Sequence, residues 1–237
     1  MFRKKNAMEC DPIVDVNNES ICQEYVRSAI GLKPGCLLGP REQMNFATAF
    51  LDGSAIYGST PKSAEDLRLL EGGRLRMDYG QVLPLDEHNP NCRGDVEGNK
   101  CFKSGDERVN HNAGLAALHT LMVREHNRMA ALLESVNPHW DEETLYQEAR
   151  RIVGAEIQQI TYNEFLPALL GEKLMETFEL ESKANGYHME YNDDLPITML
   201  NSVGNGILPF ILSLLPPNLY FVQAVRYEIG ERNQIYV

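Results

Sequence analysis

The sequence lacks the features that mark several classes of protein. It has no run of ~20 apolar residues able to cross a bilayer, and its longest candidate, residues 207–215, is followed directly by Pro216 and Pro217. It has no basic run, and its formal net charge is −12. We therefore expect no membrane span, and the acidic charge argues against non-specific binding to nucleic acid or to anionic membranes.

Cysteine is sparse and none of it forms a C-x-x-C pair, which argues against a zinc ribbon. The five cysteines have spacings that suit local disulfides with one left over: Cys10, Cys22, Cys36, Cys92 and Cys101. Residues 18–20 form a glycosylation sequon. These are extracellular features, but the basic residues 3–5 are not followed by the apolar segment of a signal peptide. An incomplete N-terminus and an intracellular protein both remain open.

A chain of 237 residues can bury a large hydrophobic core without disulfides or metal ions to stabilise it. Residues 1–40 predict extended chain and loops with a short helix near 21–29. Residues 45–59 predict an ordered loop flanked by short helices. Residues 72–106, rich in Gly, Pro and Asn, predict two short strands or a loop excursion.

The second half has helical periodicity. Residues 112–136 predict a helix with an apolar stripe of Leu115, Leu118, Met122 and Met129. Asp141 is a good N-cap for a second helix that runs to about Leu170, with Pro167 kinking it and Gly171 ending it. A third helix within 195–215 is broken by two glycines. The pattern predicts a mainly α, loop-rich single domain with no clear internal boundary.

Two segments carry candidate chemistry. Thr48, Asp52, Ser54 and the carbonyl of Phe50 could supply oxygens to Ca²⁺, although such residues also cluster in ordinary turns. Arg108 precedes the long helix and could polarise an anionic or peroxidic ligand, although its spacing alone favours a surface ion pair with Asp106 or Glu107. His111, His119 and His126 are too far apart to share a metal, so we expect core or capping roles for them.

Taken together, seven segments resemble the animal haem peroxidase family, nearest to its peroxinectin and chorion-peroxidase type. They are residues 41–45, 48–54, 57–59, 105–110, 119–128, 148–153 and 160–167. The resemblance runs from about residue 10 to residue 209. It implies a partial haem-peroxidase-like domain over residues 1–217, the middle portion of the family domain, and a divergent tail over 218–237. It implies a mainly helical domain around haem b, an extracellular location, and oxidation of small electron donors by hydrogen peroxide. It also places Arg108 on the distal arginine, Thr48, Phe50, Asp52 and Ser54 on a calcium loop, and Cys92–Cys101 on a disulfide.

The sequence departs from the family at its haem contacts. The resemblance places the distal His and a calcium-binding Asp upstream of residue 10, so we expect them to be absent from this chain and calcium binding to be weakened. His111 stands where the family has a Glu esterified to haem. Asn205 stands where the proximal His binds iron, and a carboxamide is a poorer iron ligand than imidazole. Ser202 replaces an arginine that pairs with a haem propionate.

These departures predict a family member without normal peroxidase turnover. The alternatives are a non-catalytic secreted pseudoperoxidase that acts in adhesion or partner binding, and an incomplete gene product. We also expect a partner chain to cover apolar faces that the partial domain exposes: Leu115, Leu118, Met122, Ile152, Ile157 and Ile160.

Overall fold

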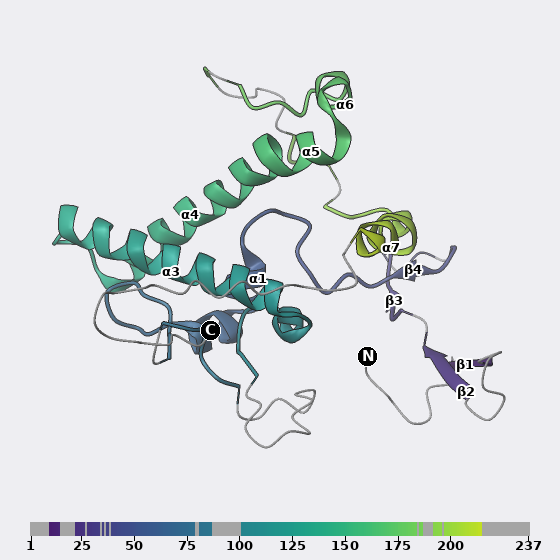
Figure 1. Cartoon of the computed structure of the whole chain (residues 1–237), viewed down its shortest axis with the longest axis horizontal. Coiled ribbons are helices and arrows are strands. Elements are labelled where there is room, and N and C mark those ends of the chain that lie inside the picture. Colours follow the sequence, from purple (N-terminus) through teal and green to yellow (C-terminus); the bar gives the residue numbers. More distant parts are fainter. Residues whose placement is uncertain are drawn as a thin grey trace, which may run out of the picture. The chain divides into compact units, whose positions relative to one another are not determined.

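A computed structural model (Figure 1) describes residues 10–14, 22–26, 28–33, 35, 37, 39–78, 81–86, 101–183, 185–186, 192–195 and 197–214. The chain divides into two compact units. One comprises Met1–Met44 and Ile197–Val237, and the other comprises Asn45–Pro196. Each unit is described by itself.

The unit Asn45–Pro196 is built from helices, which confirms the predicted mainly α class. Its elements are α1 (Ser54–Tyr57), α2 (Pro61–Leu67), the 3₁₀ turn η2 (Glu107–Asn110), α3 (Ala113–Val136), α4 (Glu142–Ile160), the π-helical turn η3 (Thr161–Phe165), α5 (Leu166–Leu170) and α6 (Glu172–Thr177). Helices α3 and α4 lie side by side, and α1 packs against α3 (Figure 1). Among the described residues, every helix is too short or too polar to span a bilayer.

Helix α3 has the predicted bounds but buries a different face. The Asn112 side chain caps it by accepting a hydrogen bond from the Leu115 amide at 2.9 Å. The buried residues are His119, Val123, His126 and Ala130. Leu118, in the predicted stripe, is 56% exposed. This face can be buried although it contains two histidines. His126 has hydrogen-bond partners inside the unit, so burying its polar ring costs little.

Helix α4 begins as predicted, since the Asp141 carboxylate accepts a hydrogen bond from the Thr144 amide at 2.9 Å. The helical chain then continues through η3 and α5 to Gly171, which has φ of 77°. Pro167 lacks an amide hydrogen, which accounts for the switch to π-helical bonding just before it, where the Leu166 amide bonds to the Thr161 carbonyl. Along this helix Leu145 and Ala149 lie in the core, whereas Ile160 is exposed.

The core of this unit lies where α1, α3, α4 and the segment 67–83 meet. Its buried members are Ile56, Tyr57, Leu67, Leu75, Leu83, Val109, Val123, Tyr146 and Val153. The Asn127 side chain ties the segment to α3, because its amide both accepts from the Leu75 N–H at 2.8 Å and donates to the Leu75 carbonyl at 3.0 Å. Gly73 has φ of 67°, and a Cβ on it would lie 2.6 Å from Leu145, so only glycine fits against α4 here.

The segment 72–106 is predicted to form two short strands or a loop excursion, and the structure describes only part of it. The described part contains isolated β-bridges, Asp78 with Val82 and Leu85 with Phe102. Cys101 takes part in a disulfide bond. Cys92, its predicted partner, lies outside the described residues, as does the predicted tail 218–237.

The unit Met1–Met44 with Ile197–Val237 contains two small antiparallel pairs, β1 (Cys10–Val14) with β2 (Cys22–Val26) and β3 (Ile30–Gly31) with β4 (Glu42–Gln43). The predicted short helix near 21–29 is wrong, because residues 22–26 are paired with β1 and that ladder satisfies their backbone groups. The predicted broken helix within 195–215 is present as the π-helical turn η4 (Val203–Ile207) and α7 (Leu208–Ser213).

Candidate functional site

The four predicted calcium-loop oxygens converge in the structure. The Thr48 hydroxyl lies 3.2 Å from the Phe50 carbonyl oxygen, 3.1 Å from Asp52 Oδ1 and 3.2 Å from Ser54 Oγ. Gly53, with φ of 72°, turns the chain into α1 between the last two of these residues. One carboxylate with hydroxyl and carbonyl oxygens is the donor chemistry that Ca²⁺ prefers. The loop therefore fits part of a calcium site, four of the six to eight oxygens that the ion takes.

The charge in this loop is carried by Asp52. Partial burial alone would raise the pKa of this carboxyl, but hydrogen bonds from the Ser54 backbone and from the Ser54 and Thr48 hydroxyls outweigh burial and lower the pKa. Asp52 therefore stays ionised at neutral pH. In the part of the chain that the structure describes, no group of three or more His, Cys, Asp or Glu side chains forms a metal cluster, so any cation at the loop depends on Asp52.

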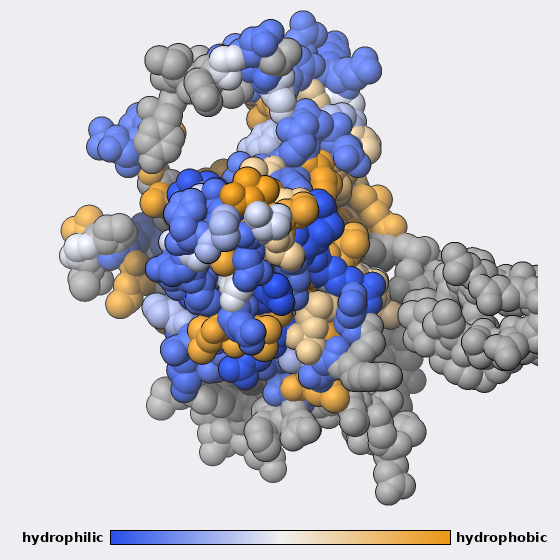
Figure 2. All heavy atoms as spheres, turned by 90° about the vertical axis from the view of Figure 1, so that its left-hand side faces the viewer, coloured by the Kyte–Doolittle hydropathy of each residue, from blue (hydrophilic) through white to orange (hydrophobic). Residues whose placement is uncertain are grey.

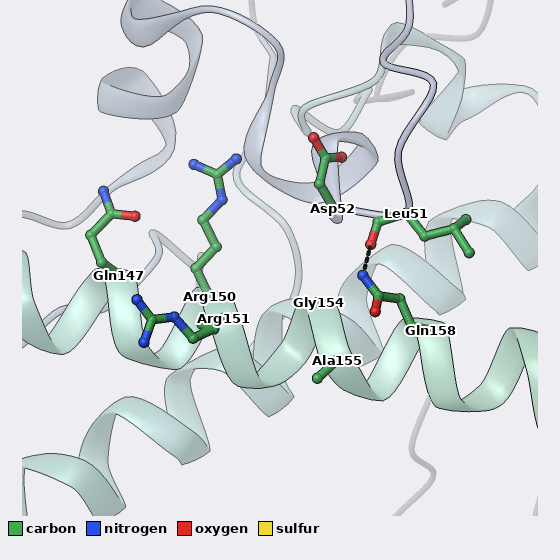
Figure 3. Close-up of a pocket in the computed structure, with 8 residues that line it drawn as sticks. All are labelled: Leu51, Asp52, Gln147, Arg150, Arg151, Gly154, Ala155 and Gln158. Atoms are coloured by element: carbon green, nitrogen blue, oxygen red, sulfur yellow. Dashed lines mark hydrogen bonds between the residues drawn. The ribbon is translucent and has the colours of Figure 1, made fainter. Parts of the chain in front are cut away.

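A hollow of about 390 Å³ borders the same loop (Figure 3). It is lined by Leu51, Asp52, Gln147, Arg150, Arg151, Gly154, Ala155 and Gln158. The Gln158 side-chain amide donates to the Leu51 carbonyl at 2.9 Å, which fixes the loop to α4. Figure 3 shows Arg150 reaching from α4 toward the loop, where its guanidinium lies 5.0 Å from the centroid of the Tyr57 ring.

Arg108 lies in η2 (Glu107–Asn110). Its Nε lies 3.0 Å from Asp106 Oδ1 and its Nη2 lies 2.7 Å from Asp106 Oδ2. The hydrogen bonds from Arg108 lower the pKa of the Asp106 carboxyl despite its partial burial. The ion-pair interpretation of Arg108 is thus present in the structure, with Asp106 as its partner and a side chain that is 62% exposed.

Two neighbouring residues fasten the Arg108 segment to α1. The Ser104 hydroxyl donates to the Ala55 carbonyl at 3.1 Å. A Cβ on Gly105 would lie 2.5 Å from the Ser54 carbonyl oxygen and would also overlap the Gly58 amide. The predicted calcium loop and the segment that leads into Arg108 are therefore neighbours, a relation that spacing in the sequence did not reveal. The available signal was the glycine, which is used where two backbones approach closely.

The three histidines near the site have different environments. His111 is exposed and follows η2, where its backbone N–H donates to the Arg108 carbonyl at 2.9 Å. His119 and His126 are buried in α3, as predicted for core histidines. Burial lowers the pKa of His119, although Asp106 opposes that change. Its Nδ1 is buried without a hydrogen-bond partner among the described residues.

Asn205 lies in η4, in the unit Met1–Met44 with Ile197–Val237, and its side chain is exposed. That unit is held together locally by Asn201, which donates to the Glu42 carboxylate at 2.7 Å and accepts from the Gln43 amide. The predicted haem-contact positions thus carry a carboxamide at Asn205, an exposed imidazole at His111 and a guanidinium already held by Asp106. At Asn205 itself, a carboxamide does not suit the predicted role of iron ligand, because it binds iron more weakly than imidazole does.

Comparison with known proteins gives consistent matches. A family model described as animal haem peroxidase matches residues 5–235. The chain is 44% identical over 174 residues to chorion peroxidase of Drosophila melanogaster, covering 72% of this chain and 22% of that protein. It is 37% identical over 218 residues to chorion peroxidase of Aedes aegypti, covering 86% and 27%. The chain therefore spans about a quarter of the length of these curated relatives.

The fold has a solved counterpart as well. Peroxidase A from Dictyostelium discoideum superposes with a TM-score of 0.59 at 28% sequence identity, over 69% of this chain and 36% of that one. The helical arrangement is thus shared with a solved peroxidase over most of the chain.

Proposed function

The chain belongs to the animal haem peroxidase family, and on that premise we propose that it is a non-catalytic homologue that retains a calcium-binding loop. The observation that carries the proposal is the amide of Asn205 at the position where the resemblance expects the iron ligand. The carboxamide is a poor substitute for imidazole. The exposed His111 supports the same conclusion, because an imidazole cannot form the ester made by a carboxylate.

The distal side supports the proposal in a different way. Arg108 stands where the family's distal arginine is expected, and a free guanidinium there would polarise peroxide. Here both arms of Arg108 bind one carboxylate, Asp106. The pair is nearly neutral as a unit, so its field at a bound peroxide would be weaker than that of an unpaired arginine.

A haem titration of the calcium-supplied protein tests the proposal. We expect no saturable Soret shift that survives desalting. Asn205→His should restore a saturable shift, because it returns an imidazole to the ligand position. Asn192→His, which adds an imidazole at another exposed asparagine, is the matched control and should not. Stoichiometric haem binding by the unmodified chain, with a peroxidase rate within about tenfold of an intact relative, would overturn the proposal.

A second candidate function is partner binding, which rests on the apolar surface of α3 and α4. Leu121, Met122, Ile152 and Ile160 line a hollow of about 670 Å³ together with Glu125, Ala155, Glu156 and Gln159. Leu121 is 56% exposed. Figure 2 shows apolar side chains reaching the surface in patches among hydrophilic ones on one face of the molecule. Exposed apolar area of this kind marks interaction sites.

Sedimentation experiments test whether this apolar surface of α3 and α4 binds another protein chain. We expect Leu121→Lys to reduce self-association or partner capture, with Leu132→Lys, another exposed leucine of α3, as the control. If the two variants associate to the same extent, the hollow is not the binding surface.

We also propose an extracellular location, supported by the disulfide at Cys101 and the sequon at residues 18–20. Small peroxides and electron donors would be partners only if the protein binds haem. The location is tested by looking for the chain in the culture medium and comparing its gel mobility before and after glycosidase treatment.

A further inference from the structure

Three aromatic residues from three helices form one cluster in the core of the unit Asn45–Pro196. Tyr57 comes from α1, His126 from α3 and Tyr146 from α4. Their ring centroids are 5.4 Å apart for Tyr57 and His126, 6.1 Å for Tyr57 and Tyr146, and 5.5 Å for His126 and Tyr146. Tyr57 and His126 are 0% exposed and Tyr146 is 1% exposed. Two phenols and an imidazole are thus sealed from solvent at contact distance.

A directed hydrogen-bond chain runs through two of these residues. Nε2 of His126 lies 2.8 Å from the Gly73 carbonyl oxygen. A carbonyl only accepts, so this nitrogen carries the proton and Nδ1 is left as the acceptor. Nδ1 lies 3.0 Å from the Tyr57 hydroxyl, which therefore donates to it. Burial lowers the pKa of His126 to about 4, so the imidazole is neutral at pH 7 and its Nδ1 lone pair faces the phenol.

We propose that Tyr57 and His126 form a proton-coupled redox site. A one-electron oxidant removes one electron from the Tyr57 ring, and the phenolic O–H bond breaks as its proton moves to Nδ1 of His126. The products are a neutral tyrosyl radical, an imidazolium whose Nε2–H remains bonded to Gly73, and the reduced oxidant. A one-electron donor reverses the step, and the proton returns to Tyr57.

The surroundings explain why a base is required. Burial raises the pKa of Tyr57, so a phenolate is not available for simple electron loss. Oxidation without proton loss would create a cationic ring in an apolar interior, which is strongly disfavoured. A base at hydrogen-bond distance removes the proton in the same step, and the charge then rests on an imidazolium that keeps its carbonyl partner.

Tyr146 shows what the same interior does without a base. It is as buried as Tyr57, but its hydroxyl has no hydrogen-bond partner among the described residues. Guanidinium carbons lie over both rings, Arg68 at 3.9 Å from the Tyr146 centroid and Arg150 at 5.0 Å from the Tyr57 centroid. A cation on the ring face makes electron loss harder in both cases, so the two tyrosines differ chiefly in the base at the Tyr57 hydroxyl. The cluster therefore directs oxidation to Tyr57, and Tyr146 serves as an internal control.

The site differs from the proposed function because it needs neither haem nor calcium. Its role would be to store one oxidising equivalent inside the protein. Complete burial keeps the radical away from reductants in solution, which would make it persist longer than radicals on exposed tyrosines such as Tyr162, 37% exposed.

Photochemical oxidation of the full chain tests this inference. Tris(bipyridine)ruthenium(II) with persulfate generates a one-electron oxidant in a light flash, ascorbate then removes surface radicals, and freeze-quench electron paramagnetic resonance records what remains. We expect a tyrosyl signal that decays at least about tenfold more slowly than surface radicals, equivalent to about 1.4 kcal/mol in the barrier. Tyr57→Phe should abolish this slow signal, and Tyr146→Phe should retain it.

Two further measurements identify the proton acceptor. In D₂O the wild-type radical should show a coupling to one exchangeable deuteron, supplied by Nδ1 of His126. His126→Gln, checked for cooperative unfolding, should lose the slow signal while Tyr57 is still present. A wild-type chain with only fast-decaying radicals, or a slow signal that survives Tyr57→Phe, would overturn the proposal and leave the pair as a structural hydrogen bond. The deuteron measurement needs no variant, so it decides the question even if His126→Gln does not fold.

Discussion

The core around His126 and the rim formed by Asp52 and Arg108 use polar side chains in opposite ways. In the core, His126 is fully buried and both of its ring nitrogens have partners in this chain. At the rim, Asp52 and Arg108 are partly open to solvent and bind residues within a few positions of themselves. The core links α1, α3 and the segment that contains Gly73, whereas each rim interaction closes only a local loop.

The difference indicates where stability and ligand binding are located. A buried hydrogen-bonded group is costly to remove because its partners are left unsatisfied. A solvent-exposed pair contributes little to folding and can exchange its partner for a ligand. We therefore expect core changes to alter the free energy of unfolding and rim changes to alter calcium binding.

The largest effect is expected for His126→Ala. It leaves the Tyr57 hydroxyl and the Gly73 carbonyl without their partner and opens a cavity, which should lower the free energy of unfolding by about 3–5 kcal/mol. Chemical denaturation measures this. His139→Ala, at an exposed position between α3 and α4, should change the free energy of unfolding by less than about 0.5 kcal/mol. Equal costs for the two variants would contradict the contrast between core and surface.

The second largest effect is expected on acidification, which should lower the free energy of unfolding. The pKa of His126 is about 4 in the folded chain against 6.5 for a free histidine. Between these values the unfolded chain binds the extra proton, so stability is full above pH 6.5 and falls by about 3 kcal/mol as pH drops to 4. Unfolding free energies measured across this window check the slope.

The variant His126→Gln isolates this contribution to the pH dependence. The pKa of His119 is also lowered by burial, so it adds to the same slope and remains in the variant. The carboxylates with lowered pKa, such as Asp52 and Asp106, titrate at lower pH. A slope unchanged by His126→Gln would mean that the residue is accessible to protons in the folded chain.

A moderate effect on ligand binding is expected at the calcium loop. Asp52→Asn keeps the shape of the side chain but removes its charge, so calcium affinity measured by isothermal titration should fall at least about tenfold. Asp66→Asn is the control, since this exposed carboxylate lies on α2 outside the loop. If both variants bind calcium like the wild type, the loop oxygens are only an ordered turn.

The smallest effect is expected for Arg108→Gln. Its ion pair with Asp106 is exposed on the arginine side, so stability should change by less than about 0.5 kcal/mol. Thermal unfolding with and without calcium measures it. A loss of more than about 2 kcal/mol would show that the rim, like the core, holds the fold together.

Local features of the fold could be predicted from the sequence to a useful degree. The α3 bounds, the Asp141 cap and the stop at Gly171 follow from caps and from periodicity, which depend on neighbouring residues. The buried face of α3 could not, because apolar content favoured Leu118 whereas burial follows partner helices that are distant in sequence. The short helix near 21–29 was wrong for the same reason, since β1 pairs with residues 22–26.

The sequence by itself determined which oxygens form the loop around Thr48, because these residues lie within seven positions and bond to one another. It also determined family membership, since ordered motifs run along most of the chain. Only the tertiary structure decided that Ser104 and Gly105 pack against α1, and that Tyr57 donates to a histidine 69 positions away. Contacts of that range depend on how α1, α3 and α4 pack, and packing selects partners by shape and satisfied hydrogen bonds across the fold.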